Sequence, residues 1–157
     1  MATKIYTGRD GKLLYEVGDA IGGGTQTEGL KVRNWTLNTT LQTLNTTTLN
    51  ESHESFVPGK SSYTGSATLL YYQDDSTNKH NVAPFMQKGG LTTTSTGVAD
   101  SDKVRLFLRL YDGTEIDTEF VIDAYVTSST ISVSTGDIVS VDFNFQGTGA
   151  PITANFL

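Results

Sequence analysis

Alternating apolar and polar residues mark three segments in the second half of the chain. They span Lys103–Tyr111, Asp117–Thr127 and Asp137–Gln146, and Asp112-Gly113 predicts a hairpin turn between the first two. Because successive side chains of a strand point to opposite faces, a sustained period of two indicates a β-strand with one buried face. The residues expected on the buried faces are Val104, Leu106, Leu108 and Leu110; Phe120, Ile122, Ala124 and Val126; and Val139, Val141, Phe143 and Phe145.

Shorter patterns predict further strands in the first half. Ile5–Tyr15 is typical of a hairpin around a Gly-Arg-Asp-Gly turn, and a strand is expected from about Leu30 to Thr39. Tyr63–Tyr72, rich in Thr, Leu and Tyr, predicts another strand. The glycine-rich segment Val17–Gly29 is expected to be a mobile linker.

One segment, Val82–Lys88, has the features of a helix. It is followed by Gly89-Gly90, and its proline falls within the first turn, where proline is tolerated. Together the elements predict a single mainly β domain over residues 1–157, a β-sandwich or barrel with one short flanking α-helix. The tail, residues 147–157, ends in Phe156-Leu157 and is expected to be docked rather than free.

A polar run rich in Thr and Asn, residues 40–62, connects two of the predicted strands. Connections of this length are uncommon in compact domains unless they have a function. We expect a long inter-subunit loop, an arm whose scattered apolar residues contact other subunits. Gly65, where the arm meets the sheet, is expected to mark a bulge or a close approach of backbones. The candidate contact residues are Leu41, Leu44, Leu49, Phe56, Val57, Pro58, Gly59 and Gly65.

Composition excludes several classes of function. The chain has 157 residues, a length typical of one domain, and it contains no cysteine for disulfides or thiolate metal sites. Its 11 basic and 17 acidic residues give a net charge of -6, which argues against nucleic-acid binding through phosphate neutralisation. It has neither an apolar run long enough to span a membrane nor a signal-peptide core, so we expect synthesis in a cytoplasm.

No motif predicts a catalytic, cofactor-binding or metal-binding site. Pro58–Ser62 resembles half of a phosphate-binding loop, but a strand follows it where the motif requires a helix. His53 and His80 are expected at the surface, without the three converging ligands typical of metal sites. Trp35 is interpreted as a packing residue. A carbohydrate-binding β-sandwich module remains the alternative, although it normally needs an aromatic platform, and an enzyme would need converging acid and base groups.

Two stretches, residues 43–72 and 131–152, resemble the signatures of tail tube proteins (major tail proteins) of tailed bacteriophages. The first has a Thr-rich run, an aromatic residue before Pro-Gly and a Thr-Gly-Ser that opens a strand ending in Tyr and Asp. The second has a Gly-acid turn, an alternating Phe strand and a Thr-Gly exit. Thr46–Gly65 matches the family's loop, and Val82–Lys88 would be its helix.

This resemblance implies a structural virion protein rather than an enzyme. It implies six-fold rings stacked into a tube, with the long loop and the termini contacting neighbouring rings and a lumen through which DNA passes. The implied partners are other copies of the chain, together with tape measure, baseplate or terminator, and sheath proteins. The implied location is the virion tail, and no cofactor or membrane is involved.

The lumen is expected to be acidic or neutral, because a basic lining would hold DNA by releasing counterions. The strand Asp117–Thr127 is the candidate lining, with a solvated outer face as the alternative. Its polar face carries carboxylates, and one from the following strand is expected beside them. The candidate lumen-facing residues are Asp117, Glu119, Asp123 and Asp142.

Overall fold

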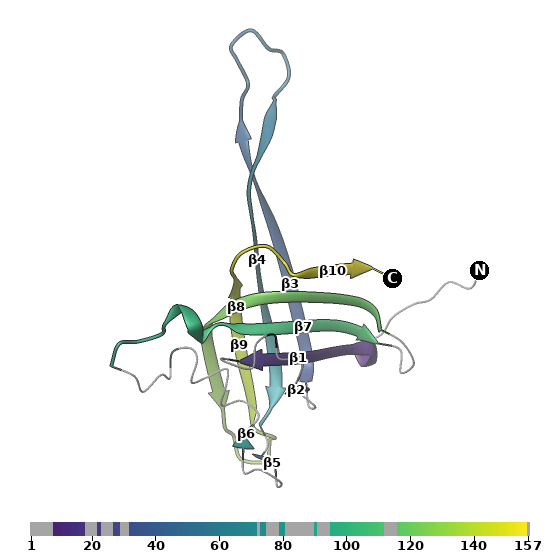
Figure 1. Cartoon of the computed structure of the whole chain (residues 1–157), viewed down its shortest axis with the longest axis vertical. Helices are drawn as coiled ribbons and strands as arrows, with labels where there is room; N and C mark the ends of the chain where they lie inside the picture. The colour runs from purple at the N-terminus through teal and green to yellow at the C-terminus, as the bar shows by residue number, and fades with distance from the viewer. Residues whose placement is uncertain are drawn as a thin grey trace, which may run out of the picture.

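The computed structural model describes residues 8–17, 22, 27–28, 32–71, 73–74, 79–80, 90, 95–111 and 116–156. Within these residues the protein is mainly β, as predicted, and its remaining regular structure is two short 3-10 helices (Figure 1). The strands are β1 (Gly11–Val17), β2 (Thr27–Glu28), β3 (Val32–Asn45), β4 (Phe56–Leu70), β5 (Gln73–Asp74), β6 (Lys79–His80), β7 (Val104–Tyr111), β8 (Ile116–Ser132), β9 (Ser140–Gly147) and β10 (Thr153–Phe156), and the 3-10 helices are η1 (Gly8–Asp10) and η3 (Asp100–Asp102).

One antiparallel sheet of eight strands contains most of these elements. Its order is β2-β1-β7-β8-β9-β4-β3, β10 pairs with β8, and β5 and β6 form a separate pair. Strand β8 belongs to both halves of the sheet. Its first part pairs with β7 and β10, and its second part, from Ala124 to Ser132, pairs with β9.

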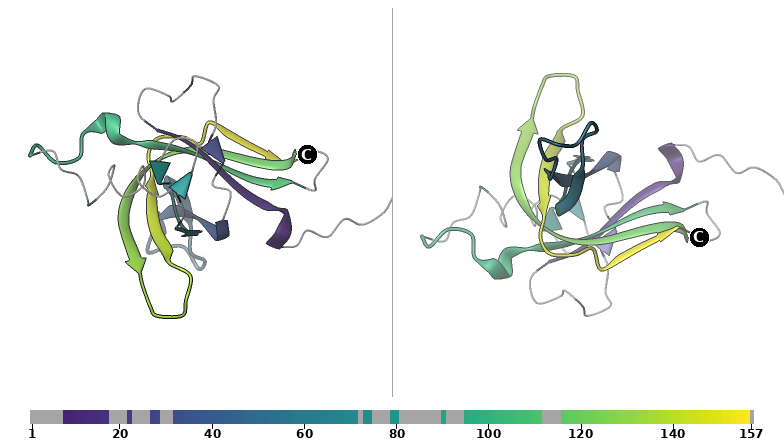
Figure 2. Two further views of the ribbon diagram at one scale, coloured as in Figure 1. Left: turned by 90° about the horizontal axis from the view of Figure 1, so that it is seen from below. Right: turned by 90° about the horizontal axis from the view of Figure 1, so that it is seen from above.

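The sheet folds at β8 into two layers that cross each other. A register shift between Val126 and Ser128 interrupts the β8–β9 ladder, and bulges of this kind bend the strand that carries them. Strands β1, β7, β10 and the first part of β8 therefore run across β3, β4, β9 and the second part of β8 (Figures 1 and 2). We call the second group the arm sheet, because it continues into the arm.

The core lies between the two layers. The predicted alternation is confirmed in β7, β8 and β9, where the apolar positions face inward, although Leu110 and Phe120 are only half-buried. Val139, which was expected in the last of these strands, directly precedes β9 and is also half-buried. Phe107 and Val121, which the alternation places on the opposite face, lie directly across from each other and are also buried. The fully buried side chains are mainly Leu13, Leu69, Val104, Leu106, Leu108, Ile122, Val141, Phe143 and Phe145.

The start of the chain differs in part from the prediction. Gly8–Asp10 forms a 3-10 helix rather than a hairpin turn, and β1 pairs with β7 and β2. The expected partner strand at residues 5–7 lies outside the described residues. In the segment interpreted as a mobile linker, Thr27–Glu28 forms β2, because its backbone pairs with Leu14 and Tyr15.

Two further predictions fall on residues that are not described, the helix Val82–Lys88 and the turn at Asp112-Gly113. Strands β7 and β8 nevertheless pair from Tyr111 and Ile116 onward, so a short connection joins them. The tail is docked as expected: β10 adds to β8, with Thr153 opposite Val121.

Candidate assembly surfaces

The arm is a two-stranded β-ribbon, which corrects the expectation of an irregular loop over residues 40–62. β4 pairs with β9 only as far as Thr64, opposite Gln146. Beyond that point β3 and β4 pair with each other alone within the described part, up to Asn45 opposite Phe56. At about 3.3 Å per residue, residues 39–45 extend the ribbon roughly 20 Å beyond the arm sheet (Figure 1).

A β-bulge interrupts the ribbon at Pro58-Gly59. Leu41 pairs with Ser61 but Thr43 pairs with Pro58, so β4 contains one extra residue here. Proline lacks the N–H needed in a central strand and is tolerated at bulges and edges. A Cβ atom at Gly59 would lie 3.1 Å from the Gln42 carbonyl oxygen, so the glycine allows the close approach. The Pro58–Ser62 motif is therefore part of β4 itself, with a bulge where a turn was expected, and the strand continues where a phosphate-binding loop requires a helix.

Hydrogen bonds connect the two sides of the arm at its tip. The Thr46 amide donates to the Ser55 carbonyl oxygen at 2.8 Å, and the Ser55 amide donates to Thr47 Oγ1 at 2.8 Å. Glu51 accepts hydrogen bonds from the Thr48 amide and the Ser55 hydroxyl. The Thr, Asn and Ser residues of this run thus stabilise the arm although it has no core. They favour an extended chain, and their side chains form hydrogen bonds with the backbone at the turn.

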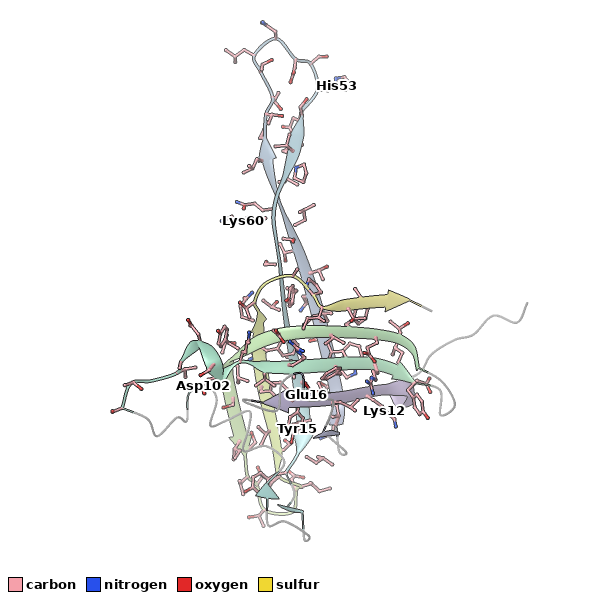
Figure 3. All side chains as sticks on the ribbon, viewed as in Figure 1. Lys12, Tyr15, Glu16, His53, Lys60 and Asp102 are labelled. Carbon is pink, nitrogen blue, oxygen red and sulfur yellow. The ribbon has the colours of Figure 1, made fainter. Side chains whose placement is uncertain are left out.

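The apolar side chains of the arm are exposed to solvent in the isolated chain. Leu49 at the tip is 105% exposed, Leu41 57% and Phe56 52%, and Leu44 and Val57 form an exposed cross-strand pair. Lys60 lies along the ribbon and His53 near its tip (Figure 3). Exposed apolar residues that gather on one projecting element are typical of an interaction site.

The base of the arm is fixed inside the subunit. Tyr63 is buried, its ring lies against Gly147, and its hydroxyl donates to the carbonyl oxygens of Gly149 at 2.9 Å and Thr148 at 3.2 Å. Burial, followed by the negative charge of Asp123, raises the pKa of the Tyr63 hydroxyl above its ordinary value. The hydrogen bonds of Tyr63 thereby link the base of the arm to the C-terminal segment.

Gly65 also lies at this base, within the subunit, whereas the sequence grouped it with the contact residues of the arm. It is buried opposite Phe145, so the predicted close approach is confirmed.

The arm sheet has two open edges in the described part of the chain. β3 pairs only with β4, and β8 beyond Ala124 pairs only with β9. Its outer face is polar and almost uncharged, and hydrogen bonds such as Thr36–Ser66 (2.8 Å) and Asn144–Ser128 (2.7 Å) run across it. The outward positions are Asn34, Thr36, Asn38, Thr40, Ser62, Thr64, Ser66, Thr68, Ser128, Thr130, Asp142, Asn144 and Gln146.

The four candidate lumen carboxylates do not form one cluster. Asp142 is exposed on the arm sheet, where it accepts a hydrogen bond from Thr68 Oγ1 at 2.5 Å, whereas Glu119 and Asp123 lie on the other layer. The expectation that Asp142 lies beside them is wrong, because Asp142 pairs with Thr130, which lies beyond the register shift at which β8 bends. The side chain of Asp117 is not described.

Glu119 and Asp123 are paired with cations on β7. Arg109 Nε donates to Glu119 at 2.5 Å, and Arg105 donates to both oxygens of Asp123, at 2.8 and 3.3 Å. The hydrogen bonding of Arg105 to the Asp123 carboxylate, together with the negative charges of Asp123 and Glu16, raises the pKa of Arg105, against the lowering effect of burial. Glu119 and Asp123 therefore contribute ion pairs rather than free negative charge to this face.

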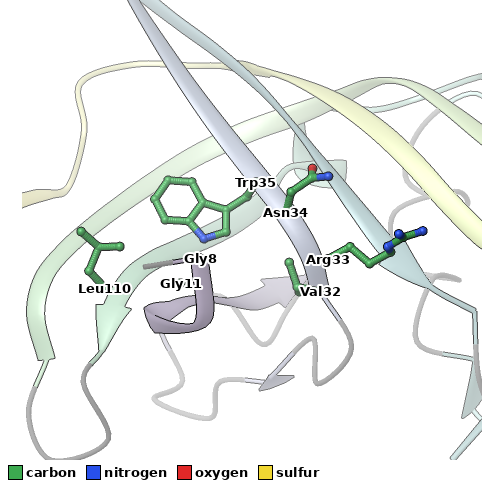
Figure 4. Close-up of a pocket in the computed structure, with 7 residues that line it drawn as sticks. All are labelled: Gly8, Gly11, Val32, Arg33, Asn34, Trp35 and Leu110. Atoms are coloured by element: carbon green, nitrogen blue, oxygen red, sulfur yellow. The ribbon is translucent and has the colours of Figure 1, made fainter. Parts of the chain in front are cut away.

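Trp35 packs against the core at the edge where β3 passes β1. Its Nε1 atom lies near Gly11, beside a hollow of ≈ 290 Å³ lined also by Val32 and Leu110 (Figure 4). The packing interpretation is therefore confirmed. Among the described residues no three His, Asp or Glu side chains converge to hold a metal ion, and the described chain contains no helix of the length and apolar character needed to cross a membrane.

Comparison with known proteins gives no sequence relative but several solved structures of the same fold. No protein-family model and no curated protein matches the chain. A chain of the SPP1 tail tube, solved by solid-state NMR and cryo-electron microscopy, superposes with a TM-score of 0.69 at 12% identity, over 98% of this chain and 81% of that one.

Two other solved assemblies contain similar chains. One is the tail of an empty gene transfer agent particle with C6 symmetry, with a TM-score of 0.67 and 14% identity over 98% of this chain and 99% of that one. The other is the six-fold symmetrised baseplate of the anti-feeding prophage, with a TM-score of 0.68 and 8% identity over 95% of both chains. The resemblance indicated by residues 43–72 and 131–152 is confirmed at the level of the fold: the chain has the fold of the phage tail tube proteins.

Proposed function

We propose that this protein is a tail tube subunit of a phage or phage-like particle, which forms six-fold rings that stack into a conduit for DNA. The observation that carries the proposal is the arm, a projecting two-stranded ribbon with exposed Leu41, Leu44, Leu49 and Phe56, on a fold shared with tail tube chains. Ordering an element that adds no core is costly, about 1–2 kcal/mol per residue, and a permanent partner surface offsets that cost. Synthesis in the host cytoplasm and incorporation into the virion tail belong to the same proposal.

The open edges of the arm sheet support ring closure. Unpaired strand edges are templates for pairing with another chain, and the edges of β3 and of the second part of β8 lie at opposite sides of one sheet. A head-to-tail contact between two different surfaces gives a closed ring when its rotation closes. We assign six copies because the similar chains come from assemblies described with six-fold symmetry.

Ring closure through these edges makes the outer face of the arm sheet the lining of the lumen. Its other face is covered by the β1–β7–β8 layer, which then lies on the outside, where the circumference is larger. The lining is composed of hydroxyl and amide groups, with Asp142 as its acidic residue. The described outward positions of this face include no phosphate-neutralising cation, so DNA passes without being held.

The other proposed partners follow from the same function. They are a tape measure protein inside the tube, a baseplate or terminator protein at its ends, and a sheath protein in a contractile tail. The carbohydrate-binding alternative gains no support, because the one tryptophan packs beside Gly11 rather than forming a platform. Sedimentation velocity across a wide concentration range tests the proposal. We expect monomers to give way to hexamers and larger species as concentration rises, and a monomer at every concentration would contradict it.

A further inference from the structure

The core is incomplete at the β3 edge of the arm sheet. The hollow of ≈ 290 Å³ beside Trp35 lies between the two layers there, since Val32 and Trp35 come from β3 and Leu110 comes from β7 (Figure 4). Val32 and Trp35 pack against the buried core but are only partly buried themselves. An apolar cavity of about 150 Å³ already takes a benzene molecule, so this hollow has room for an aliphatic side chain.

The opposite edge of the same sheet carries an apolar side chain that its own subunit leaves uncovered. Ile131, near the end of β8, pairs directly with the fully buried Val141, so both side chains point to the core-side face of the arm sheet. Ile131 is nevertheless 41% exposed. No strand of the described chain pairs with the other side of β8 at this point.

Strand pairing places the hollow and Ile131 at corresponding heights on the two open edges. One row of directly paired residues crosses all four strands on the core-side face, and its members are Ile131, Val141, Leu69 and Val32. The next core-side row towards the arm ends at Trp35 on β3. The row that begins at the uncovered Ile131 therefore ends in the lining of the hollow.

The strand directions allow these edges of neighbouring copies to pair. β3 and β8 run antiparallel to each other, because each of the three ladders that separate them is antiparallel. In a ring whose axis follows the strands, β3 of one copy therefore meets β8 of the next in the antiparallel sense. A shift by one residue would turn core-side residues to the other face, so only even shifts join the two cores.

Two of these registers bring Ile131 of the second copy to the hollow. Without a shift it lies opposite Val32 and diagonal to Trp35, and both distances are within reach of an aromatic side chain. A shift of two residues towards the arm places it opposite Trp35. Registers that move Ile131 further away leave both apolar surfaces exposed to water, which is unfavourable.

We propose that Ile131 of a second copy of this chain fills the hollow beside Trp35, so that the core of each subunit is completed by its neighbour. This inference rests on the proposed function, because it names the side chains that meet when strand edges close a ring. The apolar contact adds what backbone pairing alone lacks: it selects the register in which the two edges join.

Cross-linking of assembled rings tests the contact, because the chain contains no cysteine of its own. Two single variants, Val32→Cys and Ile131→Cys, are prepared, assembled alone or as an equal mixture, and treated with a short bismaleimide. A mixture of Val32→Cys with Ile152→Cys is the matched control, since Ile152 is also an exposed isoleucine but precedes β10 on the other layer.

We expect a covalent dimer from the first mixture, and none from either single variant or from the control mixture. Rings that give no dimer, or an equal yield of dimer in the control mixture, would overturn the contact while leaving the tube function standing. Wild-type protein that forms no rings or tubes would overturn the proposed function itself.

The fluorescence of Trp35 gives a second reading on unsubstituted protein, because it is the one tryptophan of the chain. Its emission should shift to shorter wavelength as rings form, and its quenching by acrylamide should fall several-fold, because Ile131 of the next copy covers the indole ring. Unchanged emission and quenching in wild-type rings would overturn the contact.

Ile131→Ala measures what the contact contributes to assembly. Truncation of a buried isoleucine is costly, so the concentration needed for ring formation should rise roughly tenfold or more. Ile152→Ala, at a position 49% exposed in the subunit, should assemble as the wild type does. Equal assembly of Ile131→Ala and wild type would contradict the proposal.

Discussion

Gly65 on β4 lies directly opposite Phe145 on β9, and the Phe145 ring occupies the space that a side chain at Gly65 would need. A Cβ atom at Gly65 would lie 2.4 Å from Phe145 Cζ and 2.2 Å from the Thr36 carbonyl oxygen. The second contact is with backbone, which cannot rotate away. The glycine therefore brings the arm's two strands and β9 together at the point where the ribbon leaves the sheet.

Gly65→Ala should destabilise the fold, because the added methyl group forces β3 or Phe145 to move. Overpacking of this kind costs typically about 1–3 kcal/mol in the free energy of unfolding, measured by urea denaturation. Gly8→Ala is the control, since a Cβ atom there meets nothing within 4 Å. Equal stability of the two variants would show that the sheet opens at Gly65 without cost.

Tyr63→Phe should loosen the C-terminal segment without removing the ring from the core. The lost hydrogen bonds to Thr148 and Gly149 are expected to cost about 1 kcal/mol. Hydrogen exchange at the Ile152 amide, which donates to the Val121 carbonyl oxygen, should accelerate. Unchanged stability and exchange would indicate that β10 is held by its pairing with β8 alone.

Tyr63 also predicts how the free energy of unfolding depends on pH. The pKa of Tyr63 is raised in the folded protein, so ionisation favours the unfolded chain. Its contribution to stability is complete below about pH 10, the ordinary value for tyrosine, and is lost as the pH rises through the raised pKa. The alkaline decline in unfolding free energy should therefore be shallower in Tyr63→Phe than in the wild type. Parallel declines would contradict this assignment.

Leu49→Ser with Phe56→Ser should leave the fold intact and abolish tubes. Both side chains are already exposed in the isolated subunit, so circular dichroism and melting should change little. Buried interface anchors commonly contribute 2 kcal/mol or more each, so the concentration needed for assembly should rise by roughly 10²-fold or more. Val98→Ser is the control. A double variant that unfolds would place these side chains in the subunit's own core.

How far the sequence predicts this structure depends on whether a strand has one buried face. β7, β8 and β9 each have one buried face, so the alternation of apolar and polar residues predicted them, for example at Leu106, Ile122 and Phe143. The arm has no buried face, so no period could reveal its strands, and Pro58-Gly59 suggested a turn rather than a bulge. The β-branched Thr residues of β3 were the one available signal of extended structure.

The positions of the candidate site residues in space depend on the sheet topology, which the pattern of apolar and polar residues does not determine. β8 is one continuous strand in sequence, yet it changes layers near Val126, which separates Asp142 from Glu119 and Asp123. The charge partners of those carboxylates, Arg109 and Arg105, lie on β7 at positions that only the register reveals. The exposed apolar residues of the arm were predictable, because isolated Leu and Phe residues in a polar run cannot form a core within that run.

Asp123→Lys should therefore destabilise the subunit rather than create a DNA-binding lumen. The new cation would face Arg105 and Lys103, and the lost charged hydrogen bonds are expected to cost about 1.5–3 kcal/mol. Arg105→Glu combined with Asp123→Lys should recover part of the loss in urea denaturation. If the single variant keeps wild-type stability, the pair contributes nothing to the fold.

Asp142→Lys should instead change the channel. Repeated around a ring, it places cations on the otherwise uncharged outer face of the arm sheet, so tubes should retain DNA at low salt and release it as salt rises. Asp142→Asn controls for the loss of the carboxylate, and Asp100→Lys for a cation at an exposed position outside the arm sheet. Retention by Asp100→Lys tubes but not by Asp142→Lys tubes would show that a different face lines the channel.

The most direct test of the central claim is electron microscopy of the purified, concentrated wild-type protein. The account predicts rings of six subunits and tubes formed from stacked rings, with the arm sheet lining a central channel and the arm reaching into the neighbouring ring. Only monomers, or assemblies without a channel, would contradict it.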